Sequence, residues 1–234
     1  MISGHAGKCR QRRGRAWVAS LLVFVKICGI TRPADAIAAV DAGADAIGLN
    51  FVPTSRRYID VETARAIRAV VPDHVMTVGI FRDHPANEVL EITGALALDA
   101  AQLHGDEPPE VTAVVATGVE TVIKAVVAES PWVRSIDEHA ADMVLLDAPI
   151  PGGGVPFEWG SVGGLVTKHK ILLAAGLRPD NVAEAVRRVR PWGVDVASGV
   201  ETEPPHKDPD AIARFVAEAH AAATSAGSGP GERG

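Results

Sequence analysis

The chain has 234 residues, of which 47% are hydrophobic and 22% are charged, and its formal net charge is −6. This length suits one large α/β domain or two small ones, with enough apolar material for a sizeable core. No basic stripe follows residue 15, which argues against nucleic-acid binding, and no apolar run is long enough to suggest a membrane protein. The two cysteines, Cys9 and Cys28, offer neither a disulfide framework nor metal-ligand spacing and favour a reducing, cytoplasmic setting.

The N-terminal segment, residues 1–22, is predicted to be a disordered basic extension. An apolar run over 16–25 follows Arg10, Arg12, Arg13 and Arg15. This order superficially resembles a signal peptide, but the run is short and continues into Lys26-Ile27-Cys28-Gly29 without a small-residue cleavage site. We therefore interpret its end as the first core strand. A globular domain is expected over 23–222, followed by a flexible Gly/Ser tail over 223–234.

Between residues 23 and 222, short apolar runs of strand length alternate with segments of helical period. The runs predict eight strands, over 23–27, 46–49, 75–80, 100–103, 122–125, 143–146, 171–174 and 193–196. Helices are predicted in the intervening segments, among them 33–42, 61–70, 85–93, 181–189 and 208–222. Pro33, Asn181 and Asp208 are expected to start helices, and Gly43 is expected to end one.

Eight strands that alternate with helices point to a closed parallel (βα)8 barrel, the TIM-barrel fold, in a single domain. An open doubly wound sheet would usually have fewer strands and a Gly-rich turn after the first strand. In such barrels the active site is built at the carboxyl ends of the strands. The residues at these ends include Cys28, Asn50, Arg82, His104, Asp147, Gly176 and Ser198.

Two of these residues suggest acid–base chemistry. Cys28 follows the first strand and is either a small buried apolar residue or a thiolate that acts as base or nucleophile. Asp147 follows an apolar run, and partial desolvation would suit it to general acid catalysis, the alternative being a structural cap for the next loop. His104 is either a base or a structural histidine. Lys26 and Lys124, inside predicted strands, point either into the barrel mouth or into core ion pairs.

Other residues are candidates for binding anionic groups. Gly176 follows the seventh strand and Ser198-Gly199 the eighth, where barrels commonly hold a phosphate by backbone N–H groups. Arg57, after the second strand, carries the planar fork that pairs with a carboxylate, although a solvated loop arginine is the simpler interpretation.

Six segments in the same order resemble the phosphoribosylanthranilate isomerases, beginning with KICGIT over 26–31 and QLHGDE over 102–107. The others span 43–48, 145–147, 174–177 and 195–201, so the resemblance covers about residues 23–222. It implies an Amadori rearrangement in tryptophan biosynthesis, which converts N-(5-phosphoribosyl)anthranilate to 1-(2-carboxyphenylamino)-1-deoxyribulose 5-phosphate. It also implies a cytoplasmic enzyme that needs neither metal nor cofactor.

The resemblance assigns a role to each candidate residue. Asp147 would be the general acid that opens the ribose ring, and Cys28 the general base that removes the C2 proton. Arg57 would hold the anthranilate carboxylate, while the phosphate would be held by Gly176, Ser198 and Gly199. Two departures from the family pattern are Arg56, in place of proline, and Pro151–Gly154, which lacks a usual hydroxyl. They bear on loop conformation and efficiency, not on the reaction class.

Three alternatives stay open at this point. The related histidine-pathway isomerase would be expected to carry a carboxylate in place of Cys28. A ribulose-phosphate epimerase would be expected to show metal-ligand histidines, and only His104 qualifies. A non-catalytic barrel used for partner binding would be favoured by loss of Cys28 or Asp147, and both are present. The only partner expected is a small phosphorylated molecule, with no nucleic acid or membrane, and the chain could be a monomer or a homodimer.

Overall fold

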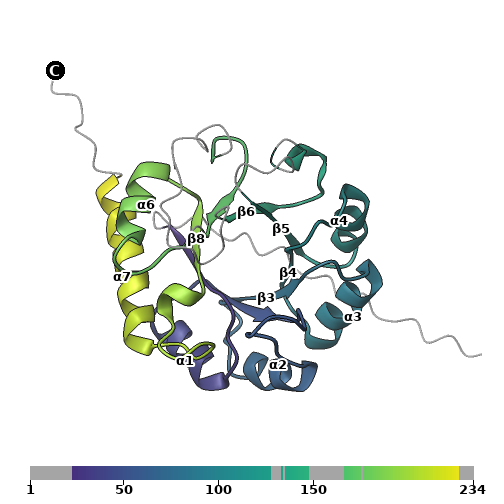
Figure 1. Ribbon diagram of the computed structural model, residues 1–234, viewed down its shortest axis with the longest axis horizontal. Coiled ribbons are helices and arrows are strands. Elements are labelled where there is room, and N and C mark those ends of the chain that lie inside the picture. The colour runs from purple at the N-terminus through teal and green to yellow at the C-terminus, as the bar shows by residue number, and fades with distance from the viewer. Residues whose placement is uncertain (1–22, 128–132, 134, 148–165, 175, 227–234) are drawn as a thin grey trace, which may run out of the picture.

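A computed structural model describes residues 23–127, 133, 135–147, 166–174 and 176–226. Eight parallel strands form a closed ring in chain order, so the predicted (βα)8 barrel is confirmed (Figure 1). Every predicted strand overlaps an observed one. The strands are β1 (Phe24–Ile27), β2 (Ala46–Asn50), β3 (Met76–Phe81), β4 (Ala100–Leu103), β5 (Thr121–Val127), β6 (Met143–Asp147), β7 (Ile171–Leu173) and β8 (Gly193–Val196).

Helices flank most of the ring of strands, although no α-helix lies between β5 and β6 among the described residues (Figure 1). They are α1 (Pro33–Asp41), α2 (Val61–Arg68), α3 (Ala86–Leu96), α4 (Pro109–Ala116), α6 (Val182–Val189) and α7 (Pro209–Ala226). The strands are buried on both faces because the helices cover the outside and side chains fill the inside, as in other parallel sheets. α7 continues past residue 222, where the barrel domain was expected to end.

Local signals account for several helix ends. Pro33 is the first residue of α1, and Gly43, just past its end, has a φ of 87°, which glycine adopts without strain. At the start of α7, the carboxylate of Asp208 accepts hydrogen bonds from the backbone N–H groups of Asp210 and Ala211. Asn181 precedes α6 without capping it by its side chain. Its amide instead braces the loop after β7, through the N–H of Arg178 and the carbonyl of Gly176.

The β5–β6 connection is described at residues 133 and 135–142. The part of it that the structure describes contains a short 3-10 helix, η2 (Ile136–Glu138), and no α-helix. Three expectations lie wholly outside the described residues: the extension over 1–22, the end of the tail over 227–234, and the loop at Pro151–Gly154.

The side chains of a strand alternate between the barrel interior and the surrounding helices. Apolar interior residues form one core cluster, which includes Phe24, Met76 and Leu145. The residues between them, such as Val25 and Val144, belong to a second cluster packed against the helices. Because of this alternation, only every second residue at the carboxyl end of a strand points toward the barrel axis.

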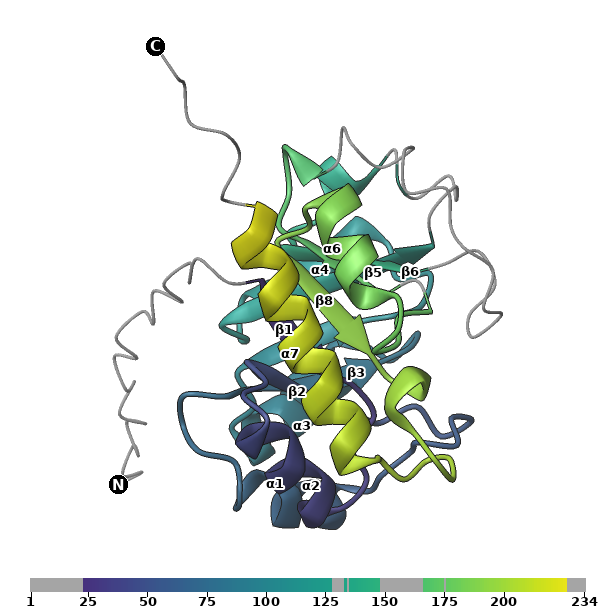
Figure 2. The same cartoon turned by 90° about the vertical axis from the view of Figure 1, so that its left-hand side faces the viewer.

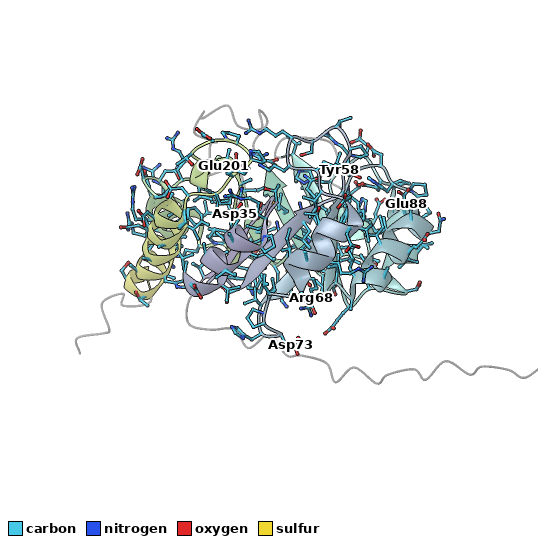
Figure 3. The ribbon with its side chains drawn as sticks, turned by 90° about the horizontal axis from the view of Figure 1, so that it is seen from below. Asp35, Tyr58, Arg68, Asp73, Glu88 and Glu201 are labelled. Atoms are coloured by element: carbon cyan, nitrogen blue, oxygen red, sulfur yellow. The ribbon has the colours of Figure 1, made fainter. Side chains whose placement is uncertain are left out.

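The two ends of the barrel are distinct. In Figure 3, Tyr58 and Glu201, from loops that follow β2 and β8, lie at one end, while Arg68 and Asp73 lie at the other. The side view shows α7 running along the outside of the barrel, with α1 and α6 as neighbours, and the chain after β8 looping out before α7 begins (Figure 2). Among the described residues, no helix is both long and apolar enough to cross a membrane.

Candidate active site

The carboxyl ends of the strands surround a cleft of about 500 Å³. Five of the six site residues predicted from the sequence line it: Cys28, Arg57, Asp147, Gly176 and Ser198. His104, Asn50 and Arg82, also expected at strand ends, line the same cleft. A space of this size at this end of a barrel is typical of a small-molecule site.

Strand alternation explains why Cys28 and Asp147 face the cleft. Cys28 follows Phe24 and Lys26 at intervals of two residues along β1, and Phe24 belongs to the interior cluster. Asp147 likewise ends β6 after Met143 and Leu145, which are both in that cluster. Both groups therefore project inward, from strands separated by β7 and β8 in the ring.

The thiol of Cys28 lies in a charged environment inside the barrel. Burial raises the pKa of the Cys28 thiol above its ordinary value, and Lys26 opposes this shift while Asp195 reinforces it. The ammonium of Lys26 is fully buried and donates to Oδ1 of Asp195 at 2.8 Å. β1 and β8 are paired in a register that sets these two residues side by side. Lys26 therefore supplies a fixed positive charge near the thiol.

Asp147 is accompanied by His104 from β4. Nε2 of His104 lies 3.6 Å from Oδ2 of Asp147, and Nδ1 of His104 lies 2.9 Å from Nε2 of Gln102. If the amide of Gln102 donates to Nδ1, the histidine carries its proton on Nε2, which faces Asp147. Because Gln102 is buried, it fixes the orientation of the imidazole ring.

Arg57 is held by a buried carboxylate. Its Nε donates to Oε1 of Glu201 at 2.6 Å and its Nη2 to Oε2 at 2.9 Å, which is a bidentate pair. Gly29 has a φ of 71°, and the side chain of Arg57 passes so close to it that a Cβ would overlap the Arg57 Cδ. Nη1 and the outer N–H of Nη2 are not used by Glu201, so the arginine can bind a second carboxylate.

The two late turns meet above β7 and β8. Gly176 has a φ of 64°, and its own N–H donates to the carbonyl of Ala174 at 2.7 Å. Because the N–H of Gly176 is already used within the turn, a phosphate at this turn would be bound by other backbone N–H groups. Ser198 opens a 3-10 helix, η4 (Ser198–Val200). Gly199 does not line the cleft. A Cβ at this position would overlap the carbonyl of Leu177, so the lack of a side chain on Gly199 lets the two turns pack together.

Lys124 is not part of the cleft. It lies between Ile123 and Ala125, which face the interior, and its ammonium donates to Glu107 at 2.6 Å on the other side of β5. Further bonds to the carbonyls of Leu103 and Gly105 make it an anchor for the loop after β4. Of the two outcomes that the sequence left open for Lys124, the core ion pair is therefore the one observed.

Three charged residues near the cleft were not among the predicted site residues: Asp195, Glu201 and Lys207. Asp195 lies inside β8 and not at its end, so the strand-end criterion does not select it. Glu201 and Lys207 follow η4 and pair with each other at 2.8 Å. No cluster of three or more His, Cys, Asp or Glu side chains suited to a metal ion occurs among the described residues.

The comparisons with known proteins agree with one another. Residues 25–218 match the family model of N-(5′-phosphoribosyl)anthranilate (PRA) isomerase. The isomerase of that name from Myxococcus xanthus is 45% identical over an alignment of 207 residues, and the match covers 83% of this chain and 94% of that protein. The enzyme of the same name from Thiobacillus denitrificans is 44% identical over an alignment of 208 residues, and the match covers 86% of this chain and 100% of that protein.

Solved structures give the same result. The phosphoribosyl anthranilate isomerase of Thermotoga maritima superposes with a TM-score of 0.80 at 39% identity, covering 85% of this chain and 98% of that one. A phosphoribosyl anthranilate isomerase in complex with reduced 1-(o-carboxyphenylamino)-1-deoxyribulose 5-phosphate has a TM-score of 0.77 at 38% identity, with the same coverage.

The fold and the cleft define a (βα)8-barrel enzyme, with an acid, a thiol and an arginine at the carboxyl ends of its strands. The match to the family model spans most of the barrel, from β1 into α7. The chain belongs to the phosphoribosylanthranilate isomerase family, which confirms the resemblance found in the sequence.

Proposed function

We propose that this chain isomerises N-(5-phosphoribosyl)anthranilate in tryptophan biosynthesis, with Asp147 as general acid and Cys28 as general base. The observation that carries the proposal is that these two groups and Arg57 line one cleft, although they come from β6, β1 and the loop after β2. Membership of the isomerase family and the likeness to a structure with a bound reduced product analogue support the substrate.

In the first step Asp147 donates a proton to the oxygen of the ribose ring. The C1–O bond breaks while the lone pair of the anthranilate nitrogen forms a C1=N double bond, so the open chain is a protonated Schiff base. Asp147 suits this step because it lies at the rim of a buried strand and is only partly exposed. His104, beside it, can hydrogen-bond the carboxylate that the step leaves behind.

In the second step the thiolate of Cys28 removes the proton from C2. The C–H electrons form a C1=C2 double bond, and the C1=N electrons return to nitrogen and neutralise its positive charge. A proton then reaches C1, and loss of the C2 hydroxyl proton leaves the ketone. Lys26 favours the thiolate by its positive charge, while the substrate is held at its two anionic ends.

The two ends of the substrate have separate sites in this proposal. Arg57 binds the anthranilate carboxylate with the part of its fork that Glu201 leaves free. The phosphate is bound by the turns at Gly176 and at Ser198 and Gly199, where small residues let backbone N–H groups approach it. We also propose that the protein works in the cytoplasm on this small molecule, as a monomer or homodimer and without nucleic-acid or membrane partners.

The proposal predicts that Cys28→Ala and Asp147→Asn each lower turnover by about two orders of magnitude or more, because each removes a group that acts in the transition state. Turnover is followed by the fluorescence of freshly prepared N-(5-phosphoribosyl)anthranilate. Circular dichroism must show that both variants fold, and Arg214→Gln, which breaks an exposed ion pair with Asp180, serves as the control. Near-normal turnover in either cleft variant would remove that residue from its role.

A further inference from the structure

A buried ion cluster lies behind Arg57, on the side away from the substrate site. Oε1 of Glu201 accepts both the Nε of Arg57 at 2.6 Å and the Nζ of Lys207 at 2.8 Å. The side chains of Glu201 and Lys207 are 1% and 0% exposed, whereas that of Arg57 is 17% exposed. Only Arg57 of these three lines the cleft.

The charges of this cluster do not cancel. Arg57 and Lys207 share the carboxylate of Glu201, with the exposed Arg56 at its edge, so the buried part of the group carries one positive charge in excess. Burial alone would raise the pKa of Glu201, but the bonds from Arg57 and Lys207 outweigh it and lower that pKa below its usual value, so the carboxylate is ionised at neutral pH. A pair of Arg57 and Glu201 without Lys207 would be neutral and would offer a second carboxylate little attraction.

Lys207 cannot itself move to bind substrate. Its Nζ also donates to the carbonyl of Ala197 at 2.9 Å, and its backbone N–H lies 3.5 Å from the carboxylate of Asp35. Arg56 also approaches Glu201, at 3.5 Å, but its side chain is 56% exposed and its charge is screened by water. Lys207 is therefore the fixed, unscreened source of the excess charge.

We propose that Lys207 and Glu201 are positioning residues that make Arg57 selective for a substrate with a carboxylate on its aromatic ring. Glu201 orients the guanidinium by a bidentate bond, and Lys207 offsets the charge of Glu201 so that Arg57 keeps an attractive field toward the cleft. The inference rests on the proposed function, in which Arg57 binds the anthranilate carboxylate.

The test compares two substrates under the same conditions: N-(5-phosphoribosyl)anthranilate and N-(5-phosphoribosyl)aniline, which lacks the carboxylate. The ratio of their kcat/KM values measures how much the enzyme gains from the carboxylate. We expect Lys207→Met to lower this ratio about tenfold, because the cluster becomes neutral. Arg214→Gln, which removes an exposed cation, should leave the ratio unchanged.

Lys207→Met strands the buried carboxylate of Glu201 and could prevent folding. The same substitution is therefore also made in the Glu201→Gln background, where the carboxylate that Lys207 neutralises is already replaced by an amide. The proposal predicts a roughly tenfold lower ratio on loss of Lys207 in each background that folds. Equal losses on both substrates would show a structural role only and would overturn the proposal. Failure of the wild-type protein to isomerise either substrate would instead overturn the proposed function.

Discussion

Cys28 combines a partly buried thiol with fixed charges of both signs. Burial raises the pKa of the thiol, Lys26 lowers it, Asp195 raises it and Lys207 lowers it, and the net result is a pKa above the ordinary thiol value. In the free enzyme the thiolate is therefore a minor form at neutral pH. The base is restrained until the substrate arrives, because the cationic Schiff base formed after ring opening would itself favour the thiolate.

This residue predicts the pH dependence of the reaction. A raised pKa means that the thiolate fraction keeps growing as pH rises, so kcat/KM should still increase beyond pH 9.0, the ordinary thiol value. In Cys28→Asp the base would be ionised already at neutral pH, and the alkaline rise should disappear. A rise that persists in Cys28→Asp would assign it to another group.

The site residues that follow strands were predictable from the sequence, whereas the buried partner of Arg57 was not. Cys28, Asp147 and Arg57 were predicted because each follows a strand or belongs to a family segment, and all three line the cleft. Glu201 lies within the last of those segments but was given no role there. Its pairing with Arg57 joins residues 144 positions apart, a contact that depends on how the barrel closes.

At the scale of the elements, strand alternation gives the two buried lysines opposite surroundings. The side chain of Lys26 lies on the face of β1 that points into the barrel, and it pairs there with Asp195. The side chain of Lys124 lies on the outer face of β5 and pairs with Glu107. The sequence could not separate these outcomes, because strands buried on both faces are apolar throughout and show no alternating pattern. Only the register between neighbouring strands reveals which face each lysine takes.

We predict that the pair of Lys124 and Glu107 stabilises the loop after β4 and has no role in catalysis. Both side chains are 2% exposed, so Lys124→Met would leave a buried carboxylate and should lower the free energy of unfolding by about 3–5 kcal/mol. Adding Glu107→Gln should recover part of this loss, because the amide oxygen can still accept from the N–H groups of Asp83 and Gly105. Urea unfolding monitored by circular dichroism measures both effects. A double variant no more stable than Lys124→Met would contradict this account.

At the scale of the whole molecule, the barrel was predictable because its signals are local. Strand-length apolar runs alternate with helical segments, and this order is enough to select a closed parallel sheet. In the described part of the β5–β6 connection, the helical turn is the 3-10 helix η2. Contacts that close the ring, such as the β1–β8 register, bring Asp195 beside Lys26, and they are not local in sequence.

The barrel places the proposed general acid at the carboxyl end of β6 and the proposed general base at the carboxyl end of β1. The most direct test is the kinetic isotope effect with substrate deuterated at C2 of the ribose, measured in single turnovers. In Cys28→Ser, proton removal should become the slow step and the isotope effect should be large. In Asp147→Asn, ring opening should become slow and the isotope effect should vanish. Similar isotope effects in the two variants, or the reverse order, would contradict the assignment of acid and base.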